Sequence, residues 1–130
     1  MQKTRFSDTP CPVARSLDRV GEWWSILILR DAFQGLSKFD EFQQSLGISP
    51  TLLARRLKDL VAHGILHKQR YQTRPVRYQY LLTERGNEFL PVLAALSQWG
   101  NRHLIDGDIS ALLVDGRTDR PIQVQLINLE

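Results

Sequence analysis

The stretch Ser49–Gly64, SPTLLARRLKDLVAHG, decides the fold of this chain. Serine followed by proline is a common start of a helix, because the serine side chain caps free amide groups and proline suits the first helical position. Apolar residues then recur at a helical spacing, at Leu53, Leu57, Leu60 and Val61. Gly64 follows as a C-terminal cap. The stretch therefore predicts one helix with one buried face.

Three further helices are expected before this stretch. The apolar spacing predicts them at Pro12–Val20, Trp23–Phe33 and Lys38–Leu46. The second of these is apolar nearly all round, so we expect it at the buried centre of the domain. Ser37 is predicted to cap the third helix.

After Gly64 the apolar residues alternate, which is typical of strands. They predict a hairpin made of the strands Ile65–Tyr71 and Val76–Leu82 and the turn Gln72–Pro75. One long helix, capped by Thr83 and covering residues 84–104, is expected to follow. Pro91 lies inside this helix and is expected to kink it.

Helices followed by a strand, a turn and a strand are typical of a winged helix-turn-helix. The predicted fold class is therefore mainly α with a small β-hairpin (α+β), ending in a long C-terminal helix. Residues 1–104 form the predicted main domain. Residues 105–130 form a C-terminal extension, predicted as a β arm with strands at Ala111–Val114 and Ile122–Leu129 and a turn at Asp115–Pro121.

The overall composition is that of a small globular protein. The chain has 130 residues, of which 42% are hydrophobic and 24% charged, and its formal net charge is +3. No apolar run approaches the roughly 18 residues that span a bilayer, and residues 1–10 lack the apolar stretch of a secretory signal. The single cysteine excludes an intrachain disulfide. We therefore expect a cytoplasmic protein that does not bind a membrane.

Positive charge is concentrated between Ser49 and Arg77. The basic residues of this segment are Arg55, Arg56, Lys58, Lys68, Arg70, Arg74 and Arg77, and its one acidic residue is Asp59. Residues 104–130 have the opposite balance, with two basic and five acidic residues. A basic segment flanked by neutral or acidic ones is typical of a polyanion site. Together with the predicted fold, this pattern indicates double-stranded DNA as the partner.

The helix after Ser49 is expected to enter the major groove. A rotation of about 100° per residue, counted from the buried Leu53, gives its exposed face. That face holds Thr51, Arg55, Lys58 and Ala62. Ser49 and Thr51 can bind phosphates or base edges, and the planar fork of Arg55 matches guanine. Arg56 lies at the border of the buried face, where either a phosphate contact or an internal salt bridge is open to it.

The hairpin is expected to touch the adjacent DNA backbone. Arg74 lies at its tip, with Gln72, Thr73 and Arg77 beside it. These residues should contact phosphate or the minor groove and add affinity that depends on salt more than on sequence.

With these features together, the sequence resembles the HxlR-type winged helix-turn-helix regulators of bacteria, within the MarR-like superfamily. The resemblance covers about residues 10–104. Its main motifs are Cys11-Pro12, Val20-Gly21-Glu22-Trp23-Trp24, Lys38-Phe39-Asp40-Glu41-Phe42, Gly47-Ile48-Ser49, Leu53-Ala54-Arg55-Arg56-Leu57, Gly64-Ile65-Leu66, Leu82-Thr83 and Gly86, and Leu93 to Trp99. Two positions depart from the family pattern, since Thr51 replaces a frequent basic residue and Val61 a frequent glutamate.

The resemblance implies a homodimer that binds a short palindromic operator. Family members act as repressors or activators, often in response to electrophiles, aldehydes or oxidants, and we expect a repressor. Dimerisation in the family uses the N-terminal and C-terminal helices, here Pro12–Val20 and Glu84–Leu104. The apolar surface of the long last helix, which exceeds what one small domain should cover, agrees with this.

Two features, Cys11 and the pair of Trp24 and Trp99, leave alternatives open. Cys11 lies where some family members keep a redox-sensing cysteine, just before a helix start that favours a thiolate, but it also fits a small buried residue at the dimer interface. Trp24 and Trp99 are expected to be core or interface anchors, with an effector pocket between their helices as the alternative. The three histidines have no metal-binding spacing, so neither a metal nor another cofactor is expected.

Two other classes of function fit this sequence less well. An enzyme is not expected, because no nucleophile–histidine pairing, phosphate-binding glycine loop or carboxylate cluster is present. The alternative to a DNA-binding regulator is a winged helix used only for protein–protein contact. Such a module should have a less basic hairpin and a more apolar helix face than Thr51, Arg55 and Lys58 provide.

Overall fold

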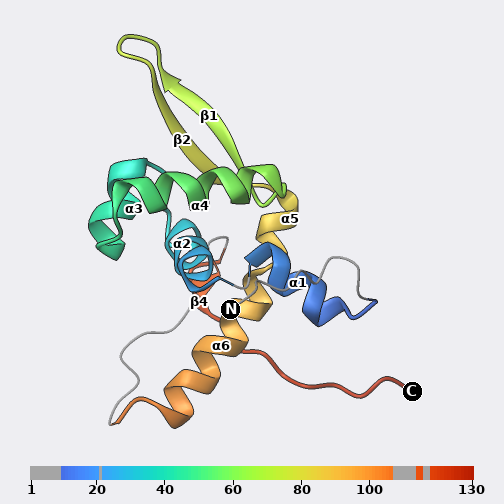
Figure 1. The fold of residues 1–130 in the computed structure, drawn as a ribbon. Coiled ribbons are helices and arrows are strands. Elements are labelled where there is room, and N and C mark those ends of the chain that lie inside the picture. The colour runs from blue at the N-terminus through green and yellow to red at the C-terminus, as the bar shows by residue number, and fades with distance from the viewer. Residues whose placement is uncertain (1–9, 21, 107–113, 116–117) are drawn as a thin grey trace. The chain divides into compact units, whose positions relative to one another are not determined.

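The computed structural model describes residues 10–20, 22–106, 114–115 and 118–130 (Figure 1). The chain divides into two compact units, Met1–Asn87 and Glu88–Glu130. No helix within the described residues is long and apolar enough to cross a membrane.

The first unit contains the helices and the hairpin in the predicted order. Its elements are α1 (Pro12–Val20), α2 (Trp23–Phe33), α3 (Phe39–Leu46), α4 (Pro50–Ala62), β1 (Leu66–Gln72), β2 (Arg77–Leu82) and α5 (Glu84–Asn87). The strands pair antiparallel, and we call the β1–β2 hairpin the wing. In Figure 1 the wing extends away from α4, which lies across α2. The predicted winged helix-turn-helix is therefore confirmed.

Helix α2 lies at the centre of this unit. It contacts α1, α3, α4 and β2, and its Ile28 and Leu29 are fully buried. The other large apolar side chains with full burial are Phe42, Leu53, Leu57, Leu60 and Leu66. Because a buried leucine contributes about 1.5–3 kcal/mol relative to an exposed one, this cluster holds α4 against the rest of the unit. Trp23 departs from the expected all-round burial, since its side chain is 69% exposed.

The start of α3 differs from the prediction. Ser37 is not the capping residue: Lys38 occupies that position, in extended backbone. The Glu41 carboxylate accepts hydrogen bonds from the backbone N–H groups of Ser37 (3.0 Å) and Lys38 (2.9 Å), and these bonds lower the pKa of Glu41. The Ser37 hydroxyl is instead 3.2 Å from Oε1 of Gln79 on β2, so the contact with the wing replaces the cap.

The wing is tied to the loop between α2 and α3. Its register pairs Leu66 with Leu82 and Gln69 with Gln79, with an irregularity between Arg70 and Gln72. An isolated bridge joins Lys38 to Gln79, so the loop acts as a third, one-residue strand beside β2. Compared with the prediction, each strand begins one residue later and Gln72 belongs to β1 rather than to the turn.

Thr83 caps α5, as predicted, and also joins it to the end of α4. Its hydroxyl accepts from the Gly86 N–H (3.0 Å) and donates to the Gly64 carbonyl (2.5 Å). Gly86 packs so closely that a Cβ there would collide with the Ile65 carbonyl oxygen. Gly64 itself has a φ of +75°, a left-handed conformation that glycine adopts without strain.

The single long helix predicted after Thr83 is wrong, because the structure has two helices. α5 ends at Asn87, and α6 covers Leu90–His103 in the second unit. Pro91 lies in the first turn of α6, where its missing N–H costs no hydrogen bond. In a continuous helix it would lose the bond to Asn87 and clash with that carbonyl. The proline therefore begins a helix rather than kinking one.

The C-terminal β arm is smaller than predicted. β3 (Val114–Asp115) pairs antiparallel with β4 (Arg120–Pro121), whereas residues 111–113 of the first predicted strand lie outside the described residues. The predicted strand Ile122–Leu129 is wrong, since these residues follow β4 without strand pairing. The backbone of Val124 instead forms two hydrogen bonds with the Gln98 side chain of α6. The Gln98 amide donates to the Val124 carbonyl (3.0 Å) and accepts from the Val124 N–H (2.8 Å).

Candidate nucleic-acid interface

Helix α4 presents the face that the sequence predicted. The Ser49 hydroxyl accepts a hydrogen bond from the Leu52 N–H (3.2 Å), and Pro50 occupies the first turn. The exposed side chains along the helix include Thr51, Arg55, Lys58 and Ala62. Ser49 is exposed as well, although its hydroxyl oxygen is engaged in the cap. Two cations thus lie on the solvent side of a helix whose opposite side is fixed by buried leucines.

Arg56 turns away from this face. Its Nη1 donates to the Asp59 carboxylate (3.1 Å), and its Nε lies 3.2 Å from Oε2 of Glu22 at the start of α2. The Nε–H is buried and not aligned with any acceptor, so the contact with Glu22 is an ion pair rather than a good hydrogen bond. Of the two roles left open for Arg56, the structure forms the internal salt bridge.

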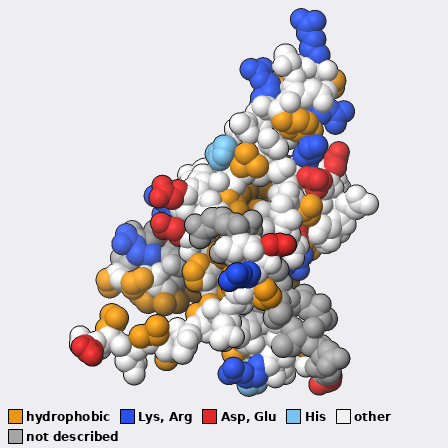
Figure 2. Space-filling model, turned by 180° about the vertical axis from the view of Figure 1, so that it is seen from behind, with side chains coloured by type: hydrophobic (Ala, Val, Ile, Leu, Met, Phe, Trp, Pro, Cys, Tyr) orange, Lys and Arg blue, Asp and Glu red, His pale blue; other side chains and the backbone are white. Residues whose placement is uncertain are grey.

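The wing carries the second group of predicted residues. Arg74 and Arg77 are exposed, and Figure 2 shows Lys and Arg side chains gathered over the outer part of the hairpin. Gln72 is half-buried, and its Nε2 donates to the Arg74 carbonyl (3.2 Å). Gln72 therefore stabilises the turn that carries Arg74. Its predicted contact with phosphate or the minor groove stays a prediction.

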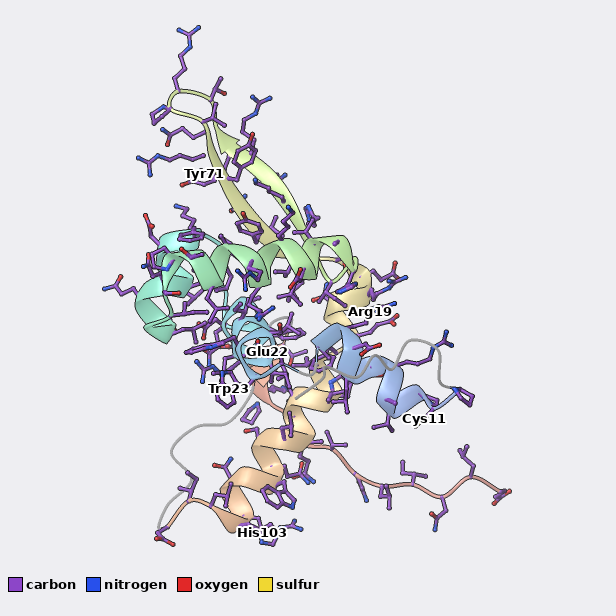
Figure 3. All side chains as sticks on the ribbon, in the orientation of Figure 1. Cys11, Arg19, Glu22, Trp23, Tyr71 and His103 are labelled. Atoms are coloured by element: carbon purple, nitrogen blue, oxygen red, sulfur yellow. The ribbon has the colours of Figure 1, made fainter. Side chains whose placement is uncertain are left out.

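Three cations and two tyrosines join this surface without having been predicted as site residues. Lys38 lies 4.8 Å above the ring of Tyr71, which projects from the wing in Figure 3, and Lys68 lies 4.3 Å above the ring of Tyr78. Arg70 is exposed beside them on β1. Lys68 and Arg70 could have been found from the sequence, because they belong to the basic segment 49–77. Lys38 is remote in sequence, and only its bridge with Gln79 brings it to the wing.

The predicted redox and effector residues are placed as follows. Cys11 is exposed, with a free thiol, and directly precedes α1. Trp24 is half-buried in the first unit, with its ring edge-on to Trp23. Trp99 is exposed in the second unit, next to the ring of His103. A pocket formed by Trp24 and Trp99 therefore stays a prediction.

No site for a metal ion is formed within the part of the chain that the structure describes. No three His, Cys, Asp or Glu side chains among these residues come together as metal ligands. The surface of α4 and the wing consists of cations, hydroxyls and aromatic rings. Such groups bind phosphate and base edges.

Comparisons with known proteins identify a family that this chain matches. The model of a family described as HxlR-like helix-turn-helix matches residues 19–108. An HTH-type transcriptional regulator of Mycobacterium tuberculosis is 40% identical over 92 residues, which are 71% of this chain and 58% of that protein. The chain thus matches little more than half the length of this relative.

Two solved structures are also similar. PA1607, described as a transcription factor, has 39% identity and a TM-score of 0.83, with 95% of this chain and 87% of that chain covered. The redox regulator HypR in its reduced form has 31% identity and a TM-score of 0.67, with coverage of 72% and 96%. The expected family and fold are thereby confirmed, and the relatives are transcriptional regulators, not enzymes.

Proposed function

The chain belongs to the HxlR-like helix-turn-helix family, and we propose that it is a transcriptional regulator that binds double-stranded DNA sequence-specifically as a homodimer. Its operator is palindromic, and its action is repression. The observation that carries the proposal is the exposed row of Thr51, Arg55 and Lys58 on α4 beside the exposed cations of the wing.

The charge balance of this surface supports DNA as the partner. Asp59 is the one acidic residue of segment 49–77, and its carboxylate is paired with Arg56. Within the described residues, none of the exposed cations Arg55, Lys58, Lys68, Arg70, Arg74 and Arg77 forms a salt bridge. Such an unopposed cluster attracts a polyanion and releases its counterions on binding.

The helix and the wing have different tasks in this proposal. α4 has the length and exposed face to lie in the major groove, where Arg55 can read guanine through two parallel hydrogen bonds. The wing cations, Arg74 above all, contact phosphates or the minor groove and set the register without reading many bases. Affinity thus comes largely from the wing and specificity largely from α4.

Exposed apolar side chains support the homodimer. Val13 and Leu17 of α1 are 68% and 50% exposed, and Val92, Leu96 and Trp99 of α6 are similarly open to solvent. Burying such side chains between two copies is favourable. A two-fold dimer then presents two copies of α4, which matches a palindromic operator.

Gel-shift titration of DNA from upstream of the chain's own gene, at low and at about 100 mM salt, tests the proposal, because specific operator binding usually survives the higher salt. A specific shift at the higher salt, competed by unlabelled upstream DNA and not by random DNA, supports it. Loss of every shift at that salt contradicts it and favours a winged helix used for protein contacts.

A thiol response is a second candidate function. Cys11 is exposed and directly precedes α1, and the similar protein HypR is a redox regulator. Oxidation of Cys11 to a mixed or intersubunit disulfide would change the surface proposed for dimerisation. Gel shifts with diamide on the wild type and on Cys11→Ser test this, and an identical response of the two proteins contradicts it.

A further inference from the structure

One carboxylate, that of Glu22, connects the start of α2 to the helix proposed to read DNA. Glu22 caps α2, because its Oε2 accepts a hydrogen bond from the Ser25 N–H (3.2 Å). The same oxygen lies 3.2 Å from Nε of Arg56 on α4. Figure 3 shows Glu22 where α2 begins. The cap of one helix is therefore also the ion-pair partner of another.

Arg56 differs from the other cations of segment 49–77. Its side chain is 21% exposed and lies in contact with both Glu22 and Asp59. Within the described residues it is the one basic side chain of this segment that forms a salt bridge. Arg55, the next residue along the chain, is exposed on the proposed DNA-binding face. Two adjacent arginines thus have opposite surroundings.

We propose that Glu22 determines the DNA specificity of this protein by acting through Arg56. By holding the guanidinium against α2, Glu22 keeps this cation from binding phosphates of any sequence. Glu22 is a positioning residue and touches no DNA itself. The inference rests on the proposed function.

The physical argument concerns selectivity more than stability. All three side chains are partly open to solvent, and ion pairs of this kind contribute little to folding. A released arginine beside the DNA-binding face, in contrast, can reach a phosphate. Each such contact steepens the salt dependence of binding by about 0.9 in the log–log slope. Loss of Glu22 should therefore strengthen binding to all DNA and weaken discrimination.

Four variants separate this effect from a simple change in net charge. Glu22→Gln removes the carboxylate that holds Arg56 against α2 and leaves its contact with Asp59. Glu84→Gln removes an exposed carboxylate of α5 and is the matched control. Arg56→Gln and the double variant Glu22→Gln/Arg56→Gln complete a cycle. Fluorescence anisotropy gives the Kd of each protein for two duplexes of equal length, at several salt concentrations. One is the upstream DNA that gives a specific gel shift, and the other has a random sequence.

Glu22→Gln is expected to bind the random duplex about threefold more tightly, with a salt slope steeper by about 0.9 and a smaller operator-to-random ratio. Glu84→Gln should leave that ratio unchanged. Arg56→Gln should keep the wild-type slope on random DNA, and adding Glu22→Gln to it should change nothing further. The proposal is overturned if Glu84→Gln has the same effect as Glu22→Gln, or if the effect persists without Arg56.

Measurements on the free protein separate this inference from the proposed function. In the wild type, the Arg56 Nε–H should exchange with solvent more slowly than that of Arg55, and Glu22→Gln should remove the difference. Unchanged exchange, or a Glu22→Gln protein that does not fold, would make Glu22 a purely structural residue and contradict the inference. If the wild type prefers no operator, the proposed function fails while the exchange result still stands.

Discussion

The carbonyl oxygen of Ser37 accepts a hydrogen bond of 2.7 Å from the backbone N–H of Tyr80. This bond joins the loop before α3 to the second strand of the wing, and the contact between Ser37 and Gln79 side chains lies beside it. The helix-turn-helix and the wing are therefore parts of one hydrogen-bonded body. This connection holds the two groups of cations that we propose to contact DNA in a fixed arrangement.

Replacing Arg55 with alanine tests the reading of bases by α4. Arg55 is exposed, so its loss should leave folding intact while removing the proposed contact to guanine. We expect operator binding to weaken by about 1–3 kcal/mol and discrimination at one base pair to relax. Titration of the operator and its single-base variants measures both. Equal losses on operator and random DNA would assign Arg55 to phosphate contact instead.

Replacing Arg74 with alanine tests the role of the wing. Because Arg74 is exposed at the hairpin turn and is proposed to contact phosphate or the minor groove, binding should weaken by a similar factor on every sequence. The log–log salt slope should become shallower by about 0.9 if one phosphate contact is lost. A loss confined to the operator would show that the wing reads bases, contrary to this division of tasks.

Replacing Gly86 with alanine tests the junction between α4, β1 and α5. A Cβ at this position would collide with the Ile65 carbonyl oxygen, so we expect a loss of about 1–3 kcal/mol in the free energy of unfolding. Gly100→Ala in α6 is the matched control, since a Cβ there meets nothing within 4 Å. That helical substitution should stabilise the protein by about 0.5–1 kcal/mol. Urea denaturation measures both, and equal midpoints would refute the close approach.

The lowered pKa of Glu41 predicts a pH dependence of stability. The backbone hydrogen bonds from Ser37 and Lys38 favour the carboxylate, so its pKa is lower in the folded than in the unfolded protein. Its contribution is complete above the unfolded-state pKa and disappears as the pH falls through the folded-state pKa. Because Glu41 is only partly buried, we expect a small effect.

Unfolding midpoints of the wild type and of Glu41→Gln, measured across the acid range, check this prediction. The difference between the two proteins should shrink as the pH falls. Glu84→Gln, which alters an exposed carboxylate at the start of α5, serves as the control. A constant difference between wild type and Glu41→Gln at all pH values would argue against the linkage.

Local patterns in the sequence predicted the elements whose causes are local. The bounds of α1 and α2 and the cap and exposed face of α4 agree with the prediction, because capping and helical spacing act within a few residues. The break before Pro91 was also a local signal, but apolar periodicity across it suggested one helix. The helix breaks there because proline lacks a backbone N–H and its ring clashes with the preceding turn inside a helix. Neither problem arises in the first turn.

The parts that the sequence did not predict depend on contacts between remote residues. Ser37 bonds to the wing instead of capping α3, and Lys38 reaches Tyr71 through the same strand-like contact. The sequence left open whether Arg56 contacts phosphate or forms an internal salt bridge. The answer depends on Glu22, which lies at the start of another helix. No spacing rule relates these positions, so only the packed structure brings them together.

The central claim is that α4 and the wing form the DNA-binding surface. The most direct test is to record backbone amide NMR spectra of the protein while operator duplex is added. The account predicts that the largest shifts fall on residues 49–62 and 70–77, with the N–H groups of Thr51, Arg55 and Arg74 among them. Shifts concentrated on α1 or α6, with α4 and the wing unchanged, would contradict it.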